Sequence, residues 1–127
     1  MLINVPISLG ELVDKISILI VKQKNITDEN KLNDVKKELK FLQDTLVKYV
    51  TNDEISNYLS ELIKINSKLW VIEDDIRDCE RKKEFDEKFI KLARSVYITN
   101  DKRASIKLDI NKKFGSELVE VKSYEQY

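Results

Sequence analysis

The chain has 127 residues, of which 42% are hydrophobic and 36% charged, with two glycines, one proline and a formal net charge of zero. This composition excludes a collagen-like or low-complexity chain and is typical of a single helical domain with charged, solvated faces. Because the charges balance, we expect neither nucleic acid nor an anionic membrane as a partner. The absence of histidine excludes histidine-based triads and histidine-ligated zinc.

The first residues combine an alternating segment with a helix start. Residues 2–7 place apolar side chains on one face, which predicts a short strand with its proline near the end. Ser8 to Glu11 has the form of a capping box, so a helix is predicted over residues 9–24. The most apolar stretch near the amino terminus, residues 16–21, is interrupted by Ser17 and is too short for a signal peptide or a membrane span, so we expect a cytoplasmic protein.

Two further helices are predicted in the middle of the chain. Thr27 and Asp28 supply the start of the second helix, and Thr51 to Glu54 is a second capping box that starts the third, which is expected to end near Lys83. The third helix carries two interleaved heptad series, Ile55, Leu62, Leu69, Ile76 and Tyr58, Ile65, Ile72, Cys79. These series predict one continuous apolar seam against a neighbouring helix, with the single cysteine as a small buried apolar residue.

The last part of the chain predicts a long fourth helix and a second alternating segment. Apolar residues recur at helical spacing from Phe85 to Phe114, and Gly115 supplies a left-handed stop. Residues 119–123 alternate again and predict a second strand. We therefore expect one domain over residues 1–127: an all-α antiparallel bundle of about four long helices, with a small two-stranded β-ribbon formed by the termini.

A homodimer is predicted from the width of the apolar surface on the third helix. Leu59, Ile63 and Trp70 lie beside the seam and make it wider than one neighbouring helix requires.

Arg103 is the strongest functional signal, because it occupies a seam position that the pattern reserves for an apolar residue, as does Thr99. An unpaired buried charge costs several kcal/mol, on the order of 3–5, so the arginine needs a partner. Folding the third helix against the fourth brings Arg103 near Ile65 and Asn66, and Arg94 near Asp74. Three interpretations stay open: a pocket for a ligand, a structural polar layer, and a helix break at residues 99–101.

The pocket hypothesis assigns an anionic small molecule to a cationic site within the bundle. Its predicted ligand-binding residues are Arg94, Arg103, Asn100, Tyr97, Trp70, Lys15 and Lys22. The two lysines are seven residues apart and share a helix face. Lysines at this spacing are also typical of a solvated edge, and Lys15 has an alternative partner in Glu38.

Carboxylate pairs suggest a metal site as a further hypothesis. Residues 73–75 with Asp78, and Glu11 with Asp14, have spacings that could share Mg²⁺. All-α nucleoside triphosphate pyrophosphohydrolases use helical carboxylate pairs in this way, but the order and residue types differ here. Because Glu11 has a capping role and basic residues lie near Asp78, a structural role is favoured, and no metal or cofactor is expected.

Four segments resemble a small bacterial and viral family of unknown function: Gly10–Leu19, Leu69–Arg77, Leu92–Ala104 and Val119–Tyr124. The resemblance covers almost the whole chain and implies a complete one-domain protein. Members are often found beside polysaccharide-synthesis genes. This neighbourhood implies a biological context for the family but does not identify a reaction that its members catalyse. The arrangement of Lys15, Arg94 and Arg103 is also similar in kind to helical chorismate mutases, although their opening motif is missing.

Two functions follow as expectations. The leading one is a non-catalytic helical binding or assembly module that forms a dimer. The alternative is a small-molecule enzyme or sensor with a cationic pocket inside the bundle for a carboxylate or phosphate ligand, and the sequence does not decide whether the protein is an enzyme. The first predicts that Arg103→Ala damages folding or association, whereas the second predicts a loss of anion binding.

Overall fold

The computed structural model describes residues 1–127 and is all-helical. Its four helices are α1 (Leu9–Asn25), α2 (Glu29–Leu46), α3 (Asn52–Lys82) and α4 (Glu87–Phe114). The predicted all-α class and the four helices are confirmed. Because α4 runs without interruption through residues 99–101, the interpretation of this segment as a helix break is wrong.

The helix ends follow the capping residues of the sequence. The Ser8 hydroxyl accepts a hydrogen bond from the Glu11 backbone N–H at 3.1 Å, and Thr51 with Glu54 forms a complete capping box. Gly115 ends α4 with φ of 63°, in the left-handed region that glycine adopts at little cost. The capping box predicted for α1 is incomplete, because the Glu11 carboxylate binds Lys107 on α4 instead of reaching back to Ser8.

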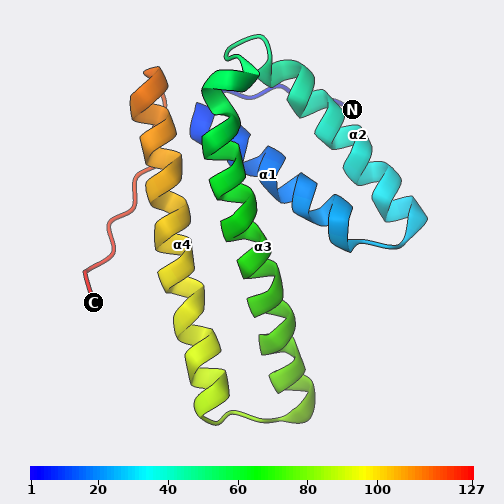
Figure 1. Cartoon of the computed structure of the whole chain (residues 1–127), viewed down its shortest axis with the longest axis vertical. Coiled ribbons are helices and arrows are strands. Elements are labelled where there is room, and N and C mark those ends of the chain that lie inside the picture. The colour runs from blue at the N-terminus through cyan, green and yellow to red at the C-terminus, as the bar shows by residue number, and fades with distance from the viewer.

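The helices form two hairpins, a short one from α1 and α2 and a longer one from α3 and α4 (Figure 1). Helix α1 packs against all three other helices, whereas α2 makes close backbone contacts with α1 alone. In Figure 1 the short hairpin lies against the upper half of the long one, and the lower half of α3 and α4 projects beyond it. Consecutive helices are therefore not all neighbours, since α2 and α3 do not pack directly.

The core lies where α1 is enclosed by the other helices. Because α1 has neighbours on both sides, it has buried residues on two faces, including Val13, Ile16 and Leu19. Leu62 of α3 and Ile110 of α4 are fully buried against it. Fully burying an aliphatic side chain of this size contributes about 1.5–3 kcal/mol. Because these buried side chains lie between α1 and the two helices of the longer hairpin, α1 is the element that joins the two hairpins.

The predicted β-ribbon of the termini is wrong, because the structure contains no strand. Residues 1–7 and 117–127 are extended, but they make no backbone–backbone hydrogen bond. The two termini lie far apart, on opposite sides of the helices (Figure 1). Alternation alone does not form a strand, since each strand needs a neighbour to satisfy its backbone N–H and C=O groups.

The apolar surface that suggested a dimer is largely covered within the chain. Leu59 packs against the core, and Ile63 and Trp70 are half-buried. The dimer stays a prediction. No helix has both the length and the apolar character that crossing a membrane would require.

Candidate functional site

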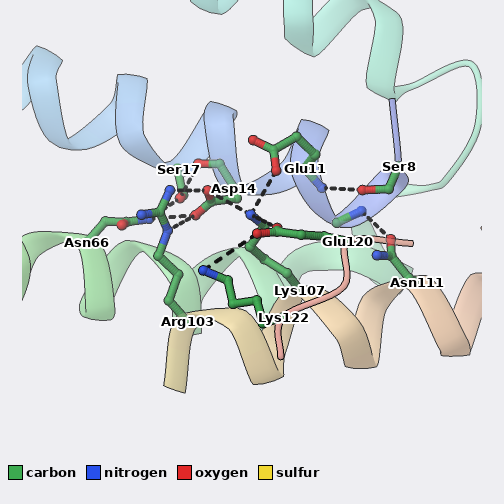
Figure 2. A network of polar contacts seen from close by, with 11 residues as sticks. Ser8, Glu11, Asp14, Ser17, Asn66, Arg103, Lys107, Asn111, Glu120 and Lys122 are labelled. Atoms are coloured by element: carbon green, nitrogen blue, oxygen red, sulfur yellow. Dashed lines mark hydrogen bonds and ion pairs between the residues drawn. The ribbon is translucent and has the colours of Figure 1, made fainter. Parts of the chain in front are cut away.

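A buried charge pair joins α1 to α4. Asp14 lies on α1 with its side chain 0% exposed, and Arg103 of α4 approaches it with a side chain that is 26% exposed. Arg103 Nε donates to Asp14 Oδ1 at 2.9 Å, and Nη2 donates to Oδ2 (Figure 2). The hydrogen bond to Asp14 is the main cause that raises the pKa of Arg103 above its usual value. Arg103 therefore turns inward and has a partner, as its seam position predicts.

Asn66 of α3 completes this cluster. Its side-chain Nδ2 donates to Asp14 Oδ1 at 3.0 Å and to Ser17 Oγ at 2.7 Å, and Ser17 Oγ donates to the Asp14 backbone carbonyl at 2.6 Å. Asn66 and Arg103 share one carboxylate oxygen, which confirms the predicted proximity of these two residues. A buried carboxylate with this many donors has its desolvation cost offset, so α1, α3 and α4 are fixed relative to one another here.

Lys107 forms a second layer of charge one turn further along α4. Its Nζ lies 2.8 Å from Glu11, 2.5 Å from Glu120 and 3.9 Å from Asp14 (Figure 2). Burial alone would lower the pKa of Lys107, but its hydrogen bonds to Glu11 and Glu120 outweigh this effect and raise it. The hydrogen bond from Lys107 lowers the pKa of Glu120 in turn. This contact ties the C-terminal tail to the helices.

Gly10 allows α1 and α4 to approach closely enough for these contacts. A Cβ at this position would lie 2.4 Å from the backbone carbonyl oxygen of Lys107. The Gly10 N–H donates to Asn111 Oδ1 at 2.7 Å. Only glycine fits here, so its role is contact between helices as well as a place in the first helical turn.

A groove of about 490 Å³ opens beside the buried pair, between α1, α3 and α4. Four of the seven predicted ligand-binding residues line it: Lys22, Trp70, Asn100 and Arg103. Lys22 comes from α1, Trp70 from α3, and the other two from α4. The structure thus brings together most of the residues that the pocket hypothesis named.

The other three predicted residues lie elsewhere. Lys15 forms an exposed ion pair with Glu38 of α2 at 2.9 Å, which is the alternative that the sequence left open. Arg94 is exposed and makes no ion pair, including with Asp74. Tyr97 packs edge-on against Tyr127 at a centroid distance of 5.1 Å and faces a different cleft, between α4 and the C-terminal tail.

The groove is less cationic than the sequence predicts. Glu73 and Asp74 line it together with Arg77, and Glu73 lies 3.7 Å from Arg77. Of the two acidic groups that suggested a metal, Glu11 and Asp14 bind Lys107 and Arg103 of α4. No group of three or more cysteine, aspartate or glutamate side chains is arranged to hold a metal ion.

The sequence pattern does not predict that Asp14 is the partner of Arg103, or that Ser17 and Lys107 lie beside this pair. A signal existed in the stripe Gly10, Asp14, Ser17 and Val21, whose spacing of three and four residues places it on one helix face. Small and polar residues on such a stripe indicate close contact with another helix. The stripe does not show which residue of which helix meets it.

The geometry defines an all-helical protein with a polar groove where three helices meet. No protein-family model matches the chain, and no curated protein or solved structure matches it. The family resemblance noted from the sequence stays a prediction, and the function is argued from the geometry of the groove.

Proposed function

We propose that the protein is a helical binding protein whose groove between α1, α3 and α4 holds a small ligand through an anionic group. This develops the alternative that the sequence suggests, a pocket inside the bundle for a carboxylate or phosphate ligand. The observation that supports it is the state of Arg103. Of the five N–H groups of its guanidinium, two bind Asp14, and the remaining three have no acceptor in the protein.

The buried pair prepares Arg103 for a ligand. Asp14 fixes the inner edge of the guanidinium, so binding an anion at the outer edge does not require the side chain to be ordered again. Ordering a long side chain costs about 0.5–1.5 kcal/mol, which this arrangement saves at the moment of binding. Arginine also presents parallel N–H groups that match a carboxylate or a phosphate.

The other groove residues have polar groups that the fold leaves free. The Lys22 ammonium, the Asn100 amide and the Trp70 indole N–H make no hydrogen bond or ion pair with the protein. A cation, an amide and an aromatic ring around one arginine are typical of sites that orient a small polar molecule. None of these groups stabilises the fold through a polar contact, so all three are available to a ligand, which supports the proposal.

Trp70 is the only tryptophan of the chain and lines the groove, so its fluorescence can report binding directly. We expect hexanoate and inorganic phosphate to change this fluorescence with saturation. Lys22→Gln should weaken the binding of both because it removes a free cation from the groove. Lys24→Gln is the matched control, because Lys24 is exposed on the same helix and does not line the groove.

Two results contradict the proposal. One is that neither anion changes the fluorescence at millimolar concentration. The other is that Lys22→Gln and Lys24→Gln weaken binding equally, because the anions would then respond to overall charge and have no site at the groove.

Self-association is a second candidate, in keeping with the assembly module predicted from the sequence. It is favoured by the two extended tails, whose apolar side chains are exposed and include Leu2, Val5 and Val121. Exposed apolar side chains gathered on unpaired segments are typical of contact surfaces. The proposed partner is a second copy of the chain, because every copy carries the same two exposed apolar tails.

Sedimentation velocity of the whole chain tests this second candidate. A dimer that dissociates when Val5 and Val121 are both replaced by serine supports it, whereas a 14.9 kDa species at all concentrations contradicts it. Because neither valine lines the groove, the same variant should keep its anion binding.

A further inference from the structure

The charges that line the groove and the one directly behind it cancel. Lys22, Arg77 and Arg103 contribute three positive charges, and Glu73 and Asp74 contribute two negative ones. Asp14, behind Arg103, supplies a third negative charge. A ligand with a large net negative charge, such as a dicarboxylate, therefore gains little from the groove as a whole.

Two of these charges have no partner. Arg103 pairs with Asp14 and Arg77 lies near Glu73, but neither Lys22 nor Asp74 forms an ion pair or a side-chain hydrogen bond with the protein. Lys22 and Asp74 have opposite charge and line the same groove, yet they do not pair with each other. A free anion-binding group and a free cation-binding group thus face the same space.

The spacing along α3 separates the two kinds of group. Asn66, Trp70 and Asp74 follow one another at intervals of four residues and share one helix face. Asn66 marks the level of Arg103, because both bind the same oxygen of Asp14 (Figure 2). At 1.5 Å per residue, Asp74 lies about 12 Å further along α3, with Trp70 about halfway.

We propose that the ligand is a zwitterion, with a carboxylate or phosphate at Arg103 and an ammonium group at Asp74. This inference rests on the proposed function and specifies its ligand. Charge-assisted contacts of about 2.8 Å at each end leave roughly 6 Å between the charged groups of the ligand. This length excludes an α-amino acid as a bridge and fits an ω-amino carboxylate or amino-phosphate whose apolar middle lies along Trp70.

The test compares ligands of one length and different charge by Trp70 fluorescence. The probes are 6-aminohexanoate, hexanoate and hexylamine, with glycine as a zwitterion that is too short. We expect 6-aminohexanoate to bind about two- to fivefold more tightly than hexanoate, the range typical of one solvent-exposed ion pair. Hexylamine should bind more weakly than hexanoate, because it lacks the anionic group that Arg103 holds. Glycine should also bind more weakly, because it is too short to reach Asp74 and lacks the apolar chain that lies along Trp70.

Asp74→Asn should remove the advantage of 6-aminohexanoate and leave hexanoate binding unchanged. Because Asp74 is exposed and makes no polar contact, this variant should fold normally, which circular dichroism checks. Asp75→Asn is the matched control, since Asp75 is the adjacent carboxylate and does not line the groove.

Failure of the zwitterion proposal and failure of the proposed binding function give different results. Equal affinity for 6-aminohexanoate and hexanoate, with both weakened by Lys22→Gln, overturns the zwitterion and keeps an anion site. An unchanged preference in Asp74→Asn also overturns it, because the ammonium group would then bind elsewhere. If no probe changes the fluorescence, the proposed function itself is contradicted.

Discussion

Replacing Arg103 by methionine tests how much the buried pair contributes to the fold. The methionine keeps an apolar stem of similar reach but removes both hydrogen bonds to Asp14. Asp14 then keeps Asn66 at 3.0 Å, and its nearest cation is Lys107 at 3.9 Å. Removing one partner of a buried pair costs about 3–5 kcal/mol. Since the Arg103 side chain is 26% exposed, water can reach the vacated space, and we expect the lower end, about 3 kcal/mol.

Chemical denaturation and thermal unfolding measure this effect. For a domain of this size, about 3 kcal/mol corresponds to a decrease in Tm of roughly 10 °C. Asp14→Asn should cost less, because the released Arg103 can turn into the groove and be hydrated. The double variant should be at least about 1 kcal/mol more stable than the sum of the single losses predicts, since the two residues act as one unit.

Arg94→Met is the matched control, because Arg94 is an exposed arginine on the same helix with no ion pair. It should change the free energy of unfolding by less than about 0.5 kcal/mol. If Arg103→Met is as mild as this control, or if the two single losses simply add, the pair does not hold α1 against α4 and the reasoning is refuted.

Three further predictions concern the surroundings of the site. Gly10→Ala should destabilise the protein by about 2–3 kcal/mol in urea unfolding, because the added Cβ meets a backbone oxygen, whereas Gly115→Ala, with open space but positive φ, should cost about 1 kcal/mol. Thr99→Val should leave stability unchanged or raise it by about 1 kcal/mol in the same assay, because the Thr99 hydroxyl is buried without a hydrogen-bond partner; a clear loss would show that it has one. Since the hydrogen bond from Lys107 lowers the pKa of Glu120, the stabilisation of the tail is complete above the ordinary value of 4.5 and is lost as the pH falls through the lowered value. The order parameters of the tail amides, measured by NMR relaxation, should therefore fall in acid, and Glu120→Gln should show low values already at neutral pH; equal values in both proteins would contradict this contact.

Local signals in the sequence predict most of the helix boundaries. Ser8, Thr51 and Gly115 act within one or two turns of their own positions, so capping chemistry alone places the ends of three helices. The uninterrupted spacing around Arg103 likewise predicts that α4 continues and that the arginine turns inward. These features depend on neighbours along the chain.

The arrangement of the helices and the partner of Arg103 depend on contacts that are distant in sequence. Arg103 and Asp14 are 89 residues apart, and only the placement of α1 across α3 and α4 brings them together. The pattern shows that Arg103 needs a partner without showing which carboxylate supplies it. For residues 2–7 the prediction itself is wrong. Their alternation predicts a strand, but the fold provides no neighbouring strand for them to pair with.

A crystal structure with bound 6-aminohexanoate would show whether one ligand joins Arg103 to Asp74. We expect its carboxylate within hydrogen-bond distance of the outer guanidinium nitrogens of Arg103, while the inner edge still binds Asp14 and the ammonium group lies at Asp74. A 6-aminohexanoate molecule bound outside this groove, or an Arg103 side chain that has left Asp14 to reach it, would show that the groove is not the binding site we propose.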